Sequence, residues 1–384
     1  LVLTTLPSQV NAQLGRDFTD GVQLFDDGDY QRAIEKLQAA VEAQPELESA
    51  WYYLGRAHLS VPSPNLQAAL DAFQRAVEIT PQRPGIRLYV GQVYEDQGAY
   101  PEAQQVYQEE LRLRRGRDVE EVLMALGRVH YLAGEYGQAL SLLGDLSRSD
   151  PLNVECLYYL GQTQAALGQY DDALTSLETA SQLCIEYQSL HNRLEKGELS
   201  IVDQRQKGLT EEYLAQNYGS AMRFVSELYM WPSLNRVWGD TYYKAGRWTQ
   251  ARSAYRRCLD LEEGGNPSDP IPQSLIGQAF LGHARELFQE DGMLFQAISL
   301  VDAALENVEQ ALGNNERLAL GHNIKGEIQL FQARTYVTMP ELEITSHTFD
   351  DAIATFRKAI ELDPEYVVPL HNLGIALTDI GSFA

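Results

Sequence analysis

The sequence predicts an all-α protein, a right-handed α-solenoid of stacked antiparallel helical hairpins, and three observations lead to that prediction. A glycine recurs along the chain, a second glycine follows it after seven residues, and an aromatic residue and an alanine come next. In the segment 150–180, Gly161 lies on one helical stripe, Gly168 marks a turn, and Tyr170 and Ala173 begin a second stripe. Such a hairpin cannot bury its own apolar face, so neighbours must stack against it.

The two glycines set the length and the shape of each repeat. The first stands at Gly21, Gly55, Gly91, Gly127 and Gly161, at spacings of 34, 36, 36 and 34 residues, and returns at Gly239 and Gly374. The second stands at Gly28, Gly98, Gly134, Gly168, Gly246 and Gly381. We expect the first glycine, with the alanine, to let two helix backbones approach closely. We expect the second to end the first helix of the hairpin, helix A, in a conformation that side chains resist.

The second repeat carries the fullest set of motif residues, after an insertion of two residues: Trp51, Leu54, Gly55, Ala69, Phe73, Ala76 and Pro81. With these residues the chain resembles the tetratricopeptide repeat proteins, whose 34-residue unit has an aromatic residue, Leu-Gly, Ala, Phe, Ala and Pro at set places. The resemblance covers residues 15–180, 232–263 and 348–384 well and the remainder poorly. It implies a superhelix of helix pairs that binds other proteins.

The chain begins with an apolar stretch, residues 1–13, that is either an N-terminal arm or the remnant of a signal peptide. The stretch ends in Val10-Asn11-Ala12, which fits the small-residue pattern that a signal peptidase reads. We therefore expect an exported protein, periplasmic, on the cell surface or extracellular, rather than a cytoplasmic one. The alternative is an exposed arm.

The rest of the chain divides by its repeat pattern. Five repeats are expected over residues 14–180, a divergent helical segment over 181–231, and one clean repeat over 232–263. Residues 264–272, rich in Gly and Pro, predict a loop and a hinge. Residues 273–384 predict C-terminal tetratricopeptide-like repeats with an inserted loop at 335–347, and they end in an unpaired helix A.

Composition and motifs argue against several classes of function. Thirty Lys and Arg against 54 Asp and Glu give the 384 residues a net charge of −24, which disfavours nucleic acid and anionic lipid surfaces. The sequence contains no run of about 20 apolar residues, so it predicts no membrane span. The seven histidines form no metal-binding or catalytic motif, and no glycine loop suits a phosphate, so we expect no enzyme, metal or cofactor.

Three cysteines allow one disulfide bond and one free thiol. Cys156 opens helix A of the fifth repeat and Cys184 closes its second helix, helix B, so the two are expected to meet across the hairpin. They are predicted to pair if the protein is exported. Cys258 takes a small core position and is expected to be buried and inert.

The family resemblance implies that certain helix A positions line a concave groove. Exposed aromatic residues there would suit an extended or helical apolar peptide, and the alternative is a groove filled by the protein's own segments. The lysine and asparagine with which some members clamp a peptide carboxylate are absent, since Phe18 and Val22 stand there instead. The expected groove residues are Phe18, Val22, Phe25, Tyr52, Arg56, Leu88, Gln92, Met124, Arg128, Tyr131, Tyr158, Gln162 and Tyr243.

Two functional hypotheses follow from the sequence. One is a monomeric adaptor that binds a peptide segment of another protein. The other is self-assembly into an open head-to-tail filament, because the final helix A has no helix B to cover its apolar stripe and the first repeat has no polar cap; the alternative is that the next helix is merely left out of the sequence. The expected end-to-end interface consists of Leu370, Leu373, Gly374, Leu377 and Phe383.

Overall fold

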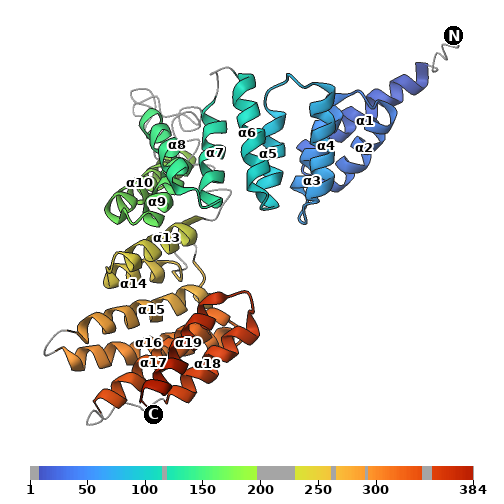
Figure 1. Ribbon diagram of the computed structural model, residues 1–384. Helices are drawn as coiled ribbons and strands as arrows, with labels where there is room; N and C mark the ends of the chain where they lie inside the picture. Colours follow the sequence, from blue (N-terminus) through green and yellow to red (C-terminus); the bar gives the residue numbers. More distant parts are fainter. Residues whose placement is uncertain are drawn as a thin grey trace. The chain divides into compact units, whose positions relative to one another are not determined.

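The computed structural model of the chain is an α-solenoid (Figure 1). It describes residues 8–114, 119–196, 230–260, 265–289, 293–339 and 348–383, and within these ranges there are helices and turns but no β-strand. Packing divides the chain into two compact units, Leu1–Pro151 and Leu152–Ala384, which are described separately.

Unit 1 consists of four helical hairpins that follow one another along the chain. In each hairpin, a turn of a few residues joins helix A to helix B, as the repeat pattern predicts. The pairs are α1 (Ser8–Asp26) with α2 (Tyr30–Ala43), α3 (Glu48–Ser60) with α4 (Leu66–Ile79), α5 (Ile86–Asp96) with α6 (Tyr100–Arg114), and α7 (Glu120–Leu132) with α8 (Tyr136–Ser149).

Unit 2 continues the same pattern with longer helices toward its end. Its pairs are α9 (Val154–Ala166) with α10 (Tyr170–Glu195), α13 (Met230–Lys244) with α14 (Trp248–Arg257), α15 (Pro270–Leu287) with α16 (Leu294–Asn314), and α17 (Ala319–Thr338) with α18 (Phe349–Leu362); α19 (Val367–Phe383) follows.

In repeats one to six, the first glycine lies where helix B packs against helix A. A Cβ atom built on Gly161 would lie 2.7 Å from Cγ of Leu177, and one on Gly55 would lie 2.7 Å from the ring of Phe73. Both partners are fully buried. The expected close approach of the two helices is therefore confirmed at these glycines.

The second glycine ends helix A in the left-handed region of backbone space. Gly28 has a φ angle of 80° and Gly168 one of 77°. Side chains disfavour this region, so glycine suits the turn into helix B. Gly381 differs, because α19 continues through it to Phe383 and does not turn there as predicted.

The ends of two helices differ from the predicted boundaries. Helix α1 starts at Ser8, so residues 8–13 belong to the first helix and not to an arm; Pro7 precedes the helix and no Pro or Gly interrupts it before Gly15. Helix α10 runs past Ala180 to Glu195, into the segment predicted as divergent. Residues 1–7 and most of that segment, 197–229, lie outside the described residues.

The predicted hinge at 264–272 is shorter than expected. Helix α15 already begins at Pro270, with Asp269 as its N-cap. Proline is tolerated at the first helical position because its missing N–H would have no partner inside the helix. The insertion predicted at 335–347 is also shorter, since α17 extends to Thr338 and residues 340–347 lie outside the described part.

Candidate functional site

Helices A of the first three repeats bring aromatic side chains together on one surface of unit 1. The ring centroids of Phe18 and Tyr53 lie 6.2 Å apart, and those of Phe25 and Tyr53 lie 5.7 Å apart. Tyr52 reaches the next repeat, where its ring lies 5.5 Å from that of Tyr89. These contacts join α1, α3 and α5 in edge-to-face geometry, which aromatic rings prefer.

Arg56 lies at the centre of these rings. Its guanidinium carbon is 4.6 Å from the ring centroid of Phe25, 5.6 Å from that of Tyr52, and 5.7 and 5.9 Å from those of Tyr53 and Tyr89. We call Phe18, Phe25, Tyr52, Tyr53 and Tyr89 with Arg56 the aromatic–arginine cluster. Cation–π attraction to several rings fixes the guanidinium in place.

The charge of Arg56 is not neutralised by an ion pair within the described part of the chain. The hydroxyl groups of Tyr52 and Tyr89 lie 3.3 Å apart and form a hydrogen bond. Burial, followed by this hydrogen bond to Tyr89, raises the pKa of Tyr52 to about 12, so the phenol stays neutral at physiological pH. The charge of Arg56 and its side-chain hydrogen bond to Tyr52 oppose this shift. Arg56 is half-buried between neutral rings, and a guanidinium has further N–H donors for another acceptor.

The other expected groove positions of unit 1 have different environments. Arg128 pairs with Glu95 of the preceding repeat, with Nε and Nη2 at 2.8 and 3.1 Å from the carboxylate oxygens. Val22, Leu88 and Tyr131 are half-buried, and Gln92 is exposed. Met124 is only 5% exposed and Phe25 9%, so both are core residues and not the exposed groove residues that the sequence predicted.

In unit 2, the expected groove positions pack against neighbours of their own repeat. The ring of Tyr158 lies 5.3 Å from that of Tyr159, and Tyr243 lies 5.2 Å from Trp248. Burial raises the pKa of Tyr243, and the carboxylate of Glu327 adds to that shift. Gln162 is half-buried.

The predicted disulfide bond is not formed. Cys156, Cys184 and Cys258 are all buried, and none of them forms a disulfide bond among the described residues. Burial raises the pKa of the Cys184 thiol to about 12. The sequence placed both residues on one hairpin, but helical spacing alone does not bring two sulfur atoms to bonding distance.

The last described helix, α19, has an exposed apolar side. Leu370 and Leu377 are each 48% exposed and Val367 is 68% exposed, whereas Leu373 is half-buried against α18. A Cβ atom on Gly374 would meet nothing within 4 Å. The side chain of Phe383 lies outside the described residues, and the end-to-end interface stays a prediction.

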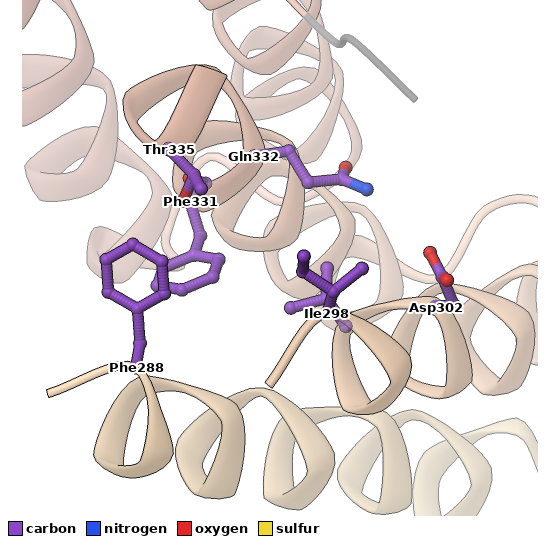
Figure 2. A pocket seen from close by; sticks show the side chains of 7 residues that line it. Phe288, Ile298, Asp302, Phe331, Gln332 and Thr335 are labelled. Atoms are coloured by element: carbon purple, nitrogen blue, oxygen red, sulfur yellow. The ribbon is translucent and has the colours of Figure 1, made fainter. Parts of the chain in front are cut away.

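A small cavity lies between the end of α15 and helices α16 and α17 (Figure 2). Its volume is about 10 Å³, and Phe288, Phe331 and Ile298 are among the residues that line it. Gln332 also lines it and is 1% exposed, and neither polar atom of its amide has a hydrogen-bond partner in the described chain. A cavity of this size holds one water molecule, which such an amide would bind.

The described residues contain no group of three or more His, Cys, Asp or Glu side chains placed to hold a metal ion. No helix in the described ranges has both the length and the apolar character to cross a bilayer.

Models of the tetratricopeptide repeat match residues 21–84, 65–118, 238–261 and 348–366. A further family model, described as subunit 3 of the anaphase-promoting complex or cyclosome, matches residues 111–180. The matches before residue 262 lie on helical hairpins, and the match at 348–366 covers α18. The chain is a tetratricopeptide repeat protein.

Similar proteins of this family are much longer than the chain. Superkiller complex protein 3 of Mus musculus is 28% identical over 234 residues, which cover 56% of this tetratricopeptide repeat protein and 14% of the relative. Tetratricopeptide repeat protein 37 of Xenopus laevis is 28% identical over 224 residues, which cover 56% of this chain and 13% of the relative. The chain thus spans about one seventh of these relatives.

Solved structures with the same kind of fold are more distant in sequence. The type IV pilus biogenesis factor PilW is 13% identical with a TM-score of 0.46, and the match covers 64% of this chain and 92% of that structure. A tetratricopeptide repeat protein from Parabacteroides merdae is 15% identical with a TM-score of 0.44, and the match covers 96% and 100%.

Sequence reasoning missed two rings of the aromatic–arginine cluster. Tyr53 and Tyr89 lie two residues before the first glycine of their repeats, whereas the predicted groove positions lie three residues before that glycine and one or four residues after it. The long phenol side chains reach across to Arg56 from this neighbouring position. The recurrence of a tyrosine directly after the predicted groove positions Tyr52 and Leu88 was the signal in the sequence that could have indicated these two rings.

Proposed function

We propose that this tetratricopeptide repeat protein is a non-enzymatic scaffold that binds a peptide segment of another protein on the aromatic–arginine cluster of unit 1. The observation that supports this proposal is Arg56, whose guanidinium lies within 6 Å of four aromatic rings and forms no ion pair in the described chain. Arginine and tyrosine contribute strongly to protein interfaces, and a guanidinium binds a carboxylate or a carbonyl oxygen.

The rings also limit what can bind. Phe25 is buried, and the other rings of the cluster are half-buried against one another, so the protein's own side chains already fill much of the surface. A partner would therefore lie across the cluster and contact ring edges and the guanidinium, without inserting a large side chain. An extended segment with an acceptor group facing Arg56 fits this description.

Selection from a peptide library displayed on phage tests the proposal. We expect the wild-type chain to enrich a common peptide motif, and Arg56→Met, which keeps an apolar side chain of similar length, to lose that enrichment. Arg75→Met is the matched control, because Arg75 lies on α4 and pairs with Glu46 and Glu78 outside the cluster. Equal enrichment by Arg56→Met, or no enrichment by the wild type, would contradict the proposal.

Self-assembly is the second candidate function, and the exposed Leu370 and Leu377 on α19 support it. Light scattering after size-exclusion chromatography should then give a mass that grows with concentration, and the double variant Leu370→Glu, Leu377→Glu should stay monomeric. A wild-type chain that is monomeric at all concentrations would contradict assembly.

Export is a separate proposal that rests on Val10-Asn11-Ala12. If this site is cleaved, intact mass of the native protein should begin at Gln13. A native protein that retains residues 1–12 would exclude cleavage there.

A further inference from the structure

Repeat six has an arginine where four other repeats have an aliphatic core residue and repeat three has the part-buried Gln104. The position directly after the repeat alanine is Ile34 in α2, Leu70 in α4, Leu174 in α10 and Ile353 in α18, and each is 5–7% exposed. In the clusters of α2 and α4 these residues pack with the next helix A. In α14 the same position, after Ala251, is Arg252.

Arg252 is as buried as the aliphatic residues that it replaces. The residue is 8% exposed, and its guanidinium carbon lies 4.4 Å from the ring centroid of Phe280 on α15. Nη2 donates a hydrogen bond of 3.2 Å to Oγ1 of Thr249. Nη1 is buried and has no hydrogen-bond partner in the described part of the chain.

No carboxylate of the surrounding helices neutralises this charge. Helices α13, α14 and α15 carry Asp240 and Glu286 as their acidic residues. Asp240 accepts a hydrogen bond of 2.8 Å from the Tyr255 hydroxyl, and Glu286 accepts one of 2.5 Å from Nε1 of Trp248. Both carboxylates are thus engaged elsewhere, although the whole chain has an excess of acidic residues.

A second positive charge lies one turn further along the helix. Burial lowers the pKa of Arg252, and the neighbouring charge of Arg256 lowers it further. A guanidinium stays protonated in proteins even so, and a buried charge without a partner is strongly unfavourable. An aliphatic residue would avoid this penalty, as it does at Ile34 and Leu70.

We propose that Arg252, with Thr249 and Arg256 on the same face of α14, is a binding site for a small oxyanion. The guanidinium offers a planar fork of N–H groups that matches two oxygens on one phosphorus or carbon atom. Thr249 and Arg256 are exposed beside the buried guanidinium, and the Phe280 ring lies 4.4 Å from its carbon atom. The site lies in unit 2 and is independent of the aromatic–arginine cluster.

Calorimetric titration of the full chain with inorganic phosphate at 0.15 M salt tests this site; the salt screens the net negative charge of the protein. We expect saturable binding at one site. Arg252→Ile, which introduces the aliphatic side chain found at this position in four other repeats, should weaken phosphate binding by about 10- to 100-fold, because each charge-assisted hydrogen bond contributes a factor of this size. Arg257→Ile removes the same charge from an exposed position of α14 and should leave the affinity unchanged.

Two further measurements make the outcome unambiguous. Arg252→Lys keeps the charge but not the fork, and we expect it to bind at least tenfold more weakly than the wild type while circular dichroism shows an intact helical fold. A parallel titration with acetate distinguishes the source of the anion: binding of acetate as well assigns the site to carboxylates, and binding of phosphate alone assigns it to phosphates. No saturable binding of either anion, equal binding by Arg252→Ile, or an equal loss in Arg257→Ile would overturn the proposal.

Discussion

Replacing Gly91 with alanine should destabilise unit 1, although alanine is the better helix former. A Cβ atom at this position would lie 2.3 Å from Cε1 and 2.5 Å from Cζ of Tyr107. The Tyr107 ring is rigid and 1% exposed, and its hydroxyl donates to the carboxylate of Glu95. The ring therefore cannot move away without repacking its surroundings and losing that hydrogen bond.

The expected change in the free energy of unfolding follows from one stabilising effect and two destabilising effects. Alanine in place of glycine gains about 1 kcal/mol of helix propensity. Overpacking costs about 1–3 kcal/mol, and loss of a hydrogen bond to a charged group costs about 1.5–3 kcal/mol. The net loss in free energy of unfolding is about 2–5 kcal/mol, which corresponds to a melting midpoint lower by about 5–15 °C.

Thermal melting followed by circular dichroism measures this change. Gly144→Ala is the matched control, because Gly144 lies inside α8 and an added Cβ would have only Arg148 within 4 Å, at 3.8 Å. Its midpoint should rise by about 1–3 °C through helix propensity alone. If Gly91→Ala also raised the midpoint, the tight contact between α5 and α6 would be refuted.

Three other changes test separate features. Gly168→Ala should lower the free energy of unfolding, measured by chemical denaturation, by about 1–2 kcal/mol, because Gly168 has a φ angle of 77° and an added side chain would meet nothing within 4 Å. Gly168→Asn should lower it less. Equal stability of all three chains would exclude a backbone effect. Burial raises the pKa of Asp240, so the folded state favours the protonated carboxyl group, and its contribution to stability falls as pH rises through that pKa. Asp240→Asn should therefore stabilise the chain more at pH 7 than at pH 4. A larger gain at pH 4 would be inconsistent with a raised pKa. Burial raises the pKa values of Cys184 and Cys258 to about 12. Iodoacetamide at pH 8 should therefore modify neither thiol until denaturant is added, which mass spectrometry can measure. Rapid labelling of the folded chain would mean that the two sites open.

The hairpins could be predicted from the sequence because glycine and alanine act there through local geometry. Gly161 must be small where Leu177 packs, and Gly168 must adopt a positive φ angle, so both are visible as fixed spacings. The ends of the helices could not be predicted in the same way. Helix α10 extends to Glu195 because nothing in the sequence after Ala180 stops a helix, although the repeat pattern ends there.

The candidate site was predictable in position but not in its contacts. The pattern placed Tyr52 and Arg56 on one surface, yet the four rings around the guanidinium come from three different helices A. Such contacts depend on how far one repeat is rotated against the next, which spacing along the chain does not determine. Arg252 shows the same limit, since its burial follows from packing between α14 and α15.

The residue that faces the first glycine has a consequence for how these repeats can be exchanged. Leu177 and Phe73 fill that place with hydrocarbon alone, so neither side chain needs a polar partner on helix A of its own repeat. Tyr107 and Tyr255 bring a buried hydroxyl that needs an acceptor, supplied by Glu95 and Asp240 on the preceding helix A. In repeats three and six, helix A and helix B therefore depend on each other. Exchanging one of the two helices alone would separate a phenol from its carboxylate.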